Sequence, residues 1–118
     1  MNIAALLPIE KTDKEQDFIN AYFEAVDFTE TGDLDQPDAG TPLDPDFERE
    51  SIIDCLAFYN RIQCYLSDDH ITQAGHDFWL TRNGHGTGFW DRPEIYGDYS
   101  DKFTEISHSF GEAYAFYE

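Results

Sequence analysis

A chain of 118 residues with a formal net charge of −18 can fold only if apolar burial outweighs the repulsion among its own carboxylates. Its 25 acidic and 7 basic residues are accompanied by ten Phe, seven Tyr and two Trp, which supply large groups for a core. A disordered acidic tail lacks such groups. The sequence therefore predicts one folded domain over residues 1–118, with an acidic half at 1–66 and an aromatic half at 67–118.

The charge balance also indicates which partners to expect. Proteins that bind DNA or RNA directly need clustered Lys and Arg to neutralise phosphates, and this sequence has no such cluster. We therefore expect a basic protein partner and no direct nucleic-acid binding. The N-terminal segment 1–16 has a short apolar stretch with no basic residue ahead of it, so neither a signal peptide nor a membrane anchor is expected.

The two cysteines indicate a reducing compartment. Cys55 and Cys64 fall on one predicted helix, about nine residues and roughly 13 Å apart along its axis. This separation is too large for a disulfide. Reduced thiols are typical of cytoplasmic proteins, so the sequence predicts a cytoplasmic location.

The first half of the chain predicts two helices joined by a long loop. Residues 12–15 have the spacing of a capping box, and apolar residues then recur with a helical period, which predicts a helix over about 13–27. Residues 28–43 carry two Gly and two Pro without a sustained period, which indicates a surface loop. Asp44, followed by proline and a long helical period, predicts a second helix over about 45–66.

The second half predicts a hairpin, a short helix and a last strand. Aromatic and branched residues lead into the turn signal Asn83-Gly84, so an antiparallel hairpin is expected over about 76–91. A helical period predicts a short helix over about 100–110, and residues 113–117 are typical of a strand. We therefore predict an α+β fold, with two longer helices and one short helix packed on a small antiparallel sheet.

Residues 78–92, FWLTRNGHGTGFWDR, resemble a segment found in a family of small tailed-bacteriophage proteins. The resemblance covers the C-terminal half and implies a phage or prophage origin, with action in the cytoplasm of a host bacterium. Small phage proteins of this kind commonly bind and inhibit host machinery. In charge and size the chain is also similar to acidic phage proteins that mimic DNA and disable restriction enzymes or CRISPR complexes.

The acidic residues of the first half form a block without local counter-charge. Between Lys14 and Arg49 the sequence holds eleven acidic residues and no basic one. The block is either a solvated face, with Asp44 and Asp46 serving a helix N-terminus, or a surface that binds the basic partner. The residues predicted to contact that partner are Glu15, Asp17, Glu24, Asp27, Glu30, Asp33, Asp35, Asp38, Asp46, Glu48 and Asp54.

Neither a metal site nor a cofactor is predicted. Residues 33–44 begin like a calcium-binding loop, but Pro37 occupies the third ligand position and Asp38 stands where the sharp turn needs glycine. The four histidines, His70, His76, His85 and His108, are irregularly spaced, and the two cysteines form no paired-thiolate motif. Zinc is therefore not expected.

The glycine-rich segment offers an alternative site. His85 lies between two glycines, either as a polar residue of an exposed turn or as a general base near Asp91 and Arg92. With His76, these residues would form the centre of a small hydrolase or ligand-binding domain. The aromatic residues of the segment resemble a base-stacking platform, but the flanking acids disfavour nucleic acid. The alternative protein-contact surface consists of Trp79, His85, Trp90 and Arg92.

The leading hypothesis is a non-enzymatic acidic inhibitor, or nucleic-acid mimic, that blocks the nucleic-acid site of a basic host protein. It predicts a convex acidic ridge. A hydrolase or ligand-binding domain predicts a concave pocket instead. A structural phage accessory protein, including one that forms a homodimer, predicts an exposed patch of aromatic residues.

Overall fold

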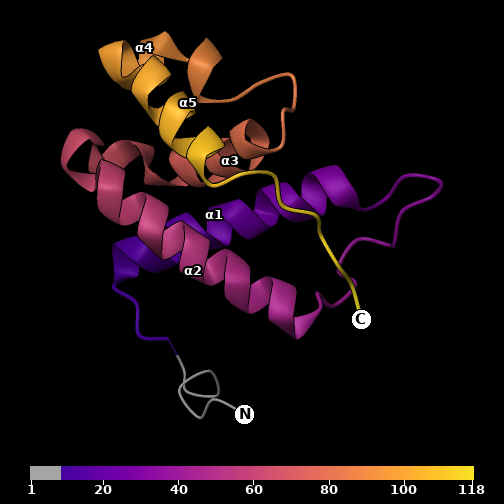
Figure 1. Cartoon of the computed structure of the whole chain (residues 1–118). Helices are drawn as coiled ribbons and strands as arrows, with labels where there is room; N and C mark the ends of the chain where they lie inside the picture. The colour runs from indigo at the N-terminus through magenta and orange to yellow at the C-terminus, as the bar shows by residue number, and fades with distance from the viewer. Residues whose placement is uncertain (1–8) are drawn as a thin grey trace.

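The computed structural model describes residues 9–118, and it is built from helices (Figure 1). Within these residues the only β-type pairing is one antiparallel bridge, between Leu43 and Tyr117. The predicted α+β fold with an antiparallel sheet is therefore wrong, and the fold is mainly α. The elements are α1 (Asp13–Glu30), α2 (Pro45–Ile62), η2 (Gln63–Tyr65), η3 (Asp68–His70), α3 (Ile71–Arg82), η4 (Phe89–Asp91), α4 (Pro93–Tyr96), η5 (Gly97–Tyr99) and α5 (Ser100–Ser109).

The first two helices begin where their capping residues predict. Thr12 and Glu15 form the capping box of α1, with the Thr12 Oγ1 accepting from the Glu15 backbone and the Glu15 carboxylate accepting from the Thr12 backbone. The Asp44 carboxylate accepts from the Asp46 and Phe47 backbone N–H groups, both at 3.1 Å, at the start of α2. Helix α1 extends three residues beyond its predicted end at 27, and α2 ends four residues before its predicted end at 66.

The expected hairpin over 76–91 is replaced by the C-terminal half of α3, a connecting segment and η4. Ile71, Ala74, Phe78 and Trp79 are buried and follow one another at helical spacing. The segment therefore forms a helix that turns its aromatic side chains toward the core. Asn83-Gly84 ends α3. The Asn83 side chain donates to the Trp79 carbonyl at 3.1 Å, and Gly84 takes a φ of +67°, which favours glycine.

The expected C-terminal strand is an extended tail that pairs at one point only. The Asp44 N–H donates to the Phe116 carbonyl at 2.8 Å, and the Glu118 N–H donates to the Pro42 carbonyl at 3.0 Å. No further extended segment of residues 9–118 lies in position to widen this pair into a sheet. In Figure 1 the tail runs beside the connection between α1 and α2.

The core is built mainly from aromatic side chains that the helices bring together. The Phe58 and Phe78 rings stack with centroids 4.1 Å apart, and Phe18 and Phe89 pack against Phe58 at 5.9 and 5.6 Å. All four of these residues are buried. Such pairs add about 0.5–1.5 kcal/mol each to the stabilisation from burial alone. Many of the aromatic residues of the sequence therefore form the core.

The N-terminal apolar stretch includes residues 1–8, which lie outside the described residues, so the expectation about a signal peptide or anchor stays a prediction. Within residues 9–118 no helix has both the length and the apolar character that crossing a membrane requires. Cys55 is buried in α2, Cys64 is exposed in η2, and both are free thiols.

Gly75 lies where α3 packs closely against α1. A Cβ atom at this position would lie 2.7 Å from the Ala21 Cβ and would also strike the Phe18 carbonyl oxygen, which belongs to the backbone. Although alanine favours a helix over glycine by about 1 kcal/mol, Gly75→Ala should lower the free energy of unfolding by about 1–3 kcal/mol. Urea unfolding measures this loss. Thr72→Ala on the exposed face of α3 is the control, and a Gly75→Ala variant more stable than the wild type would contradict the packing described.

Candidate functional site

The predicted acidic surface is divided between residues that hold the fold and residues that face solvent. Glu15 closes the α1 capping box, Glu24 pairs with His76 at 3.1 Å, and Asp54 pairs with Arg82 at 3.0 Å. Asp27 accepts a hydrogen bond from the Gly40 N–H at 3.2 Å and so ties the loop to α1. The remaining predicted contact residues lie on α1, in the loop and on the first turn of α2, and all but the half-buried Glu30 are exposed: Asp17, Glu30, Asp33, Asp35, Asp38, Asp46 and Glu48.

An open groove with a volume of about 520 Å³ lies between α2 and the C-terminal tail. The acidic residues of α2 thus line a concave surface, and not the convex ridge that the inhibitor hypothesis predicted. One wall carries Asp46, Glu50 and Asp54, which are spaced by four residues and so share one face of α2. Like charges at this spacing destabilise a helix. Asp54 is compensated by its ion pair with Arg82.

The other wall of the groove presents aromatic rings to solvent. Tyr114 is 70% exposed and Phe116 is 61% exposed, and both line the groove. They alternate with the less exposed Ala113, Ala115 and Tyr117, as expected for an extended chain. The tail is held at both ends, because the Ala113 N–H donates to the Asn83 side chain at 2.8 Å and the Phe116 carbonyl accepts from Asp44.

We call this site the acidic-aromatic groove, defined by Asp46, Glu50, Asp54, Glu112, Tyr114 and Phe116. Carboxylates bind guanidinium and ammonium groups through charge-assisted hydrogen bonds, and aromatic faces attract the same cations. The groove therefore has the chemistry to receive Arg or Lys side chains. Sequence reasoning missed Glu50, Glu112, Tyr114 and Phe116. The spacing of 46, 50 and 54 on one helix was the signal that would have revealed the acidic wall.

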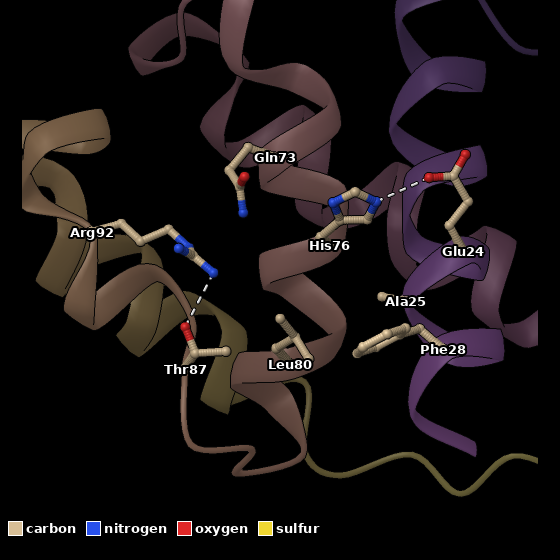
Figure 2. A pocket seen from close by; sticks show the side chains of 8 residues that line it. All are labelled: Glu24, Ala25, Phe28, Gln73, His76, Leu80, Thr87 and Arg92. Atoms are coloured by element: carbon tan, nitrogen blue, oxygen red, sulfur yellow. Dashed lines mark hydrogen bonds and ion pairs between the residues drawn. The ribbon is translucent and has the colours of Figure 1, made fainter. Parts of the chain in front are cut away.

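A second pocket, of about 480 Å³, opens between α1, α3 and the segment 84–92 (Figure 2). It brings together His76 and Arg92, two members of the predicted hydrolase or ligand-binding centre. The other two members lie elsewhere. His85 lines a separate hollow that also includes Glu30, and the exposed Asp91 carboxylate accepts hydrogen bonds from the Gly88 N–H and the Thr87 hydroxyl. These bonds lower the pKa of Asp91.

Behind Arg92 lies a buried carboxylate that sequence reasoning did not single out. Asp77 is 0% exposed, and it accepts hydrogen bonds from the Arg92 Nε at 2.9 Å, the Tyr96 hydroxyl at 2.7 Å and the Gln73 Nε2 at 3.2 Å. Burial, with the nearby Asp77 charge, raises the pKa of Tyr96, which keeps its hydroxyl a donor. Asp77 and Arg92 thus fasten the segment 84–92 to α3.

Most of the segment that carries the phage resemblance is structural. Trp79, predicted on the alternative contact surface, is instead buried in the core, where its Nε1 donates to the Thr29 hydroxyl at 2.8 Å. The Thr81 hydroxyl accepts from the Phe89 N–H at 3.0 Å, and a Cβ at Gly88 would strike this hydroxyl. Trp90 is 49% exposed and remains on the surface.

The pocket of Figure 2 offers a His76–Glu24 pair but no nucleophile free to be activated by it. Among the residues that line it, the one hydroxyl belongs to Thr87, which already bonds Asp91 and Arg92. Residues 9–118 also contain no group of three or more His, Cys, Asp or Glu side chains placed to hold a metal ion.

Comparisons with protein-family models, with curated proteins and with solved structures found no match to this chain. The resemblance of residues 78–92 to phage proteins therefore stays a prediction.

Two buried groups predict a loss of stability at alkaline pH. Burial raises the pKa of the Cys55 thiol well above its ordinary value of 9.0 and that of the Tyr22 hydroxyl above 10.0. Above those ordinary values the unfolded chain loses protons that the folded chain keeps. The free energy of unfolding therefore falls as pH rises, and each group contributes up to about 1.4 kcal/mol per pH unit. Urea unfolding between pH 8 and 11 measures the slope. Cys55→Ala should make the slope shallower near pH 9–10, and an unchanged slope would contradict the assignment.

Proposed function

We propose that this protein is an acidic inhibitor that binds a basic, nucleic-acid-binding protein and occupies the surface on which nucleic acid would lie. The observation that carries the proposal is the acidic-aromatic groove, in which the carboxylates of Asp46 and Glu50 line the same channel as the exposed rings of Tyr114 and Phe116. The proposal includes no catalytic step.

The overall charge supports this proposal. A net charge of −18 repels nucleic acid and attracts surfaces rich in Lys and Arg. Those are the residues that a nucleic-acid-binding protein uses to neutralise phosphates. Carboxylates that reach them would exclude the nucleic acid by occupying the same cations.

The aromatic wall distinguishes a binding site from a solvated acidic face. A face that serves solubility alone needs only charge, and exposed aromatic rings add a cost in water. Beside carboxylates, the Tyr114 and Phe116 rings would cover the aliphatic stem of an Arg or Lys side chain and contact its cation. Arginine is the better fit, because its planar guanidinium can stack on a ring while it bonds a carboxylate.

The phage resemblance gives the proposal its biological setting. If residues 78–92 mark a phage origin, the partner is a host protein in the bacterial cytoplasm, such as a restriction or CRISPR component. The groove itself lies outside that segment, on α2 and the tail. Its partner must therefore be identified by experiment.

A labelled octa-arginine peptide provides the first test, by fluorescence anisotropy. The groove variant combines Asp46→Asn, Glu50→Gln, Tyr114→Ala and Phe116→Ala. The control variant combines Asp98→Asn, Asp101→Asn, Phe28→Ala and Trp90→Ala, which removes the same charge and two exposed aromatic rings elsewhere. The groove variant should bind about tenfold or more weakly than the control, and all binding should weaken between 50 and 200 mM salt. Equal weakening in the two variants would mean that only net charge matters.

A further inference from the structure

The pocket of Figure 2 is lined by apolar side chains and by polar groups on two sides. Ala25 and Leu80 supply apolar lining, from α1 and α3 respectively. Arg92 lies on one side and the His76–Glu24 pair on the other, as Figure 2 shows. The volume of about 480 Å³ falls within the usual range for sites that bind small molecules. The pocket shares no lining residue with the acidic-aromatic groove.

The charges in this pocket are paired within the protein. Arg92 forms an ion pair with the buried Asp77, and His76 forms a hydrogen-bonded pair with Glu24. The pocket therefore offers no uncompensated positive charge to an anion, and the net charge of −18 adds repulsion. A cation would meet the Arg92 guanidinium. An uncharged ligand avoids both penalties.

The hydrogen-bonding groups of the pocket are mixed donors and acceptors. The Arg92 guanidinium uses its Nε on Asp77 and one bond from its Nη2 on Thr87, which leaves further N–H donors at the pocket. The Gln73 Nε2 donates to Asp77, so the Gln73 Oε1 remains as an acceptor. His76 bonds Glu24 through its Nε2, and its Nδ1 remains to donate or accept. The ring nitrogens, amino groups and carbonyls of a heteroaromatic molecule complement such a set.

An aromatic ring stands at the mouth of the pocket without a packing role. Phe28 lines the pocket and is 86% exposed. A polar residue at this position near the end of α1 would not lower the stability of the fold. A planar ligand that rested on Ala25 and Leu80 would place one face within reach of this ring. Stacking of this kind holds bases in many nucleic-acid-binding proteins and does not depend on charge.

We infer that this pocket binds a planar, uncharged heteroaromatic molecule of the size of a nucleobase or nucleoside, stacked against Phe28 and hydrogen-bonded by Arg92, Gln73 and His76. The phosphate groups of a nucleotide would be repelled by Glu24 and by the net charge. The site is thus selective for the free base or nucleoside over the nucleotide. It is independent of the proposed inhibition, since it uses other residues.

Ligand-detected NMR and isothermal titration calorimetry test this inference with adenosine, guanosine, cytidine and uridine, each paired with its 5′-monophosphate. At least one nucleoside should bind saturably, and its monophosphate should bind about tenfold more weakly. Phe28→Ala should weaken nucleoside binding about tenfold or more, whereas Phe116→Ala, which removes another exposed ring from the groove, should leave it unchanged.

Three results would overturn the inference. The first is the absence of saturable binding by every nucleoside up to about 10 mM. The second is a monophosphate that binds as tightly as its nucleoside, which would place phosphate recognition in the pocket. The third is equal binding by the wild type and Phe28→Ala. Because Phe28 is exposed, urea unfolding should show both phenylalanine variants to be as stable as the wild type.

Discussion

Replacing Arg82 by methionine should lower the free energy of unfolding by about 3–5 kcal/mol. The Arg82 side chain is 3% exposed, and its guanidinium donates to the Gly111 carbonyl at 2.9 Å, the Tyr22 hydroxyl at 3.1 Å and the Phe110 carbonyl at 3.2 Å. It also pairs with Asp54 and lies 5.0 Å from the Phe78 ring centroid. Methionine keeps the aliphatic stem but removes the donor from each of these acceptors, and each acceptor left buried without a partner costs about 1–3 kcal/mol.

Two further variants, Arg82→Lys and Arg61→Met, separate the effect of the charge from that of the hydrogen-bond geometry. Arg82→Lys keeps the charge but cannot reach acceptors on three segments at once, so it should recover only a part of the loss. Arg61→Met, at an exposed position on α2, should change stability by less than about 0.5 kcal/mol. Urea unfolding measures all three. A loss below about 1 kcal/mol for Arg82→Met would show that the tail and α5 do not depend on this side chain.

Asp77→Asn should cost about 3 kcal/mol of unfolding free energy, because it removes the negative partner of Arg92 at a fully buried position. The loss should also release the segment 84–92 from α3, since Arg92 and Tyr96 both donate to this carboxylate. Hydrogen exchange at the Gly88 and Phe89 amides would report that release. Asp101→Asn, an exposed carboxylate on α5, provides the control.

The double variant Asp77→Asn with Arg92→Met makes the cause of this loss testable. If an uncompensated Arg92 charge is responsible, removing it should restore part of the stability that Asp77→Asn alone loses. A double variant less stable than Asp77→Asn would instead assign the loss to missing hydrogen bonds and packing.

The helix starts could be predicted from sequence because capping is local. Thr12 with Glu15, and Asp44 with Pro45, satisfy the first backbone N–H groups within a few residues. The ends of α1 and α2 were less predictable. Helix α1 continues to Glu30, where the loop folds back onto Asp27, and that contact depends on residues ten or more positions away.

The hairpin was mispredicted because Asn83-Gly84 fits two different structures. The same pair can form a hairpin turn or end a helix, and the aromatic run before it fits a strand as well as a buried helix. The helix is favoured by contacts between distant residues, which include the pairs Asp77–Arg92 and Trp79–Thr29. Periodicity within the segment does not reveal these partners.

The candidate site was predicted only in part for the same reason. The sequence shows an excess of acidic residues in the first half, but the fold uses Glu15, Glu24, Asp27 and Asp54 internally. The aromatic wall of the groove comes from the last residues of the chain. These meet α2 through a backbone pairing near Asp44, which no local pattern indicates.

The most direct test of the proposed inhibition compares the proteins that three immobilised forms retain from a bacterial lysate. The forms are the wild type, the groove variant and the control variant, each washed at rising salt and then with duplex DNA. The wild type and the control variant should retain the same basic, nucleic-acid-binding protein, which DNA and salt release, and the groove variant should not retain it. Retention of the same proteins by all three forms, or of no protein that DNA displaces, would contradict the proposal.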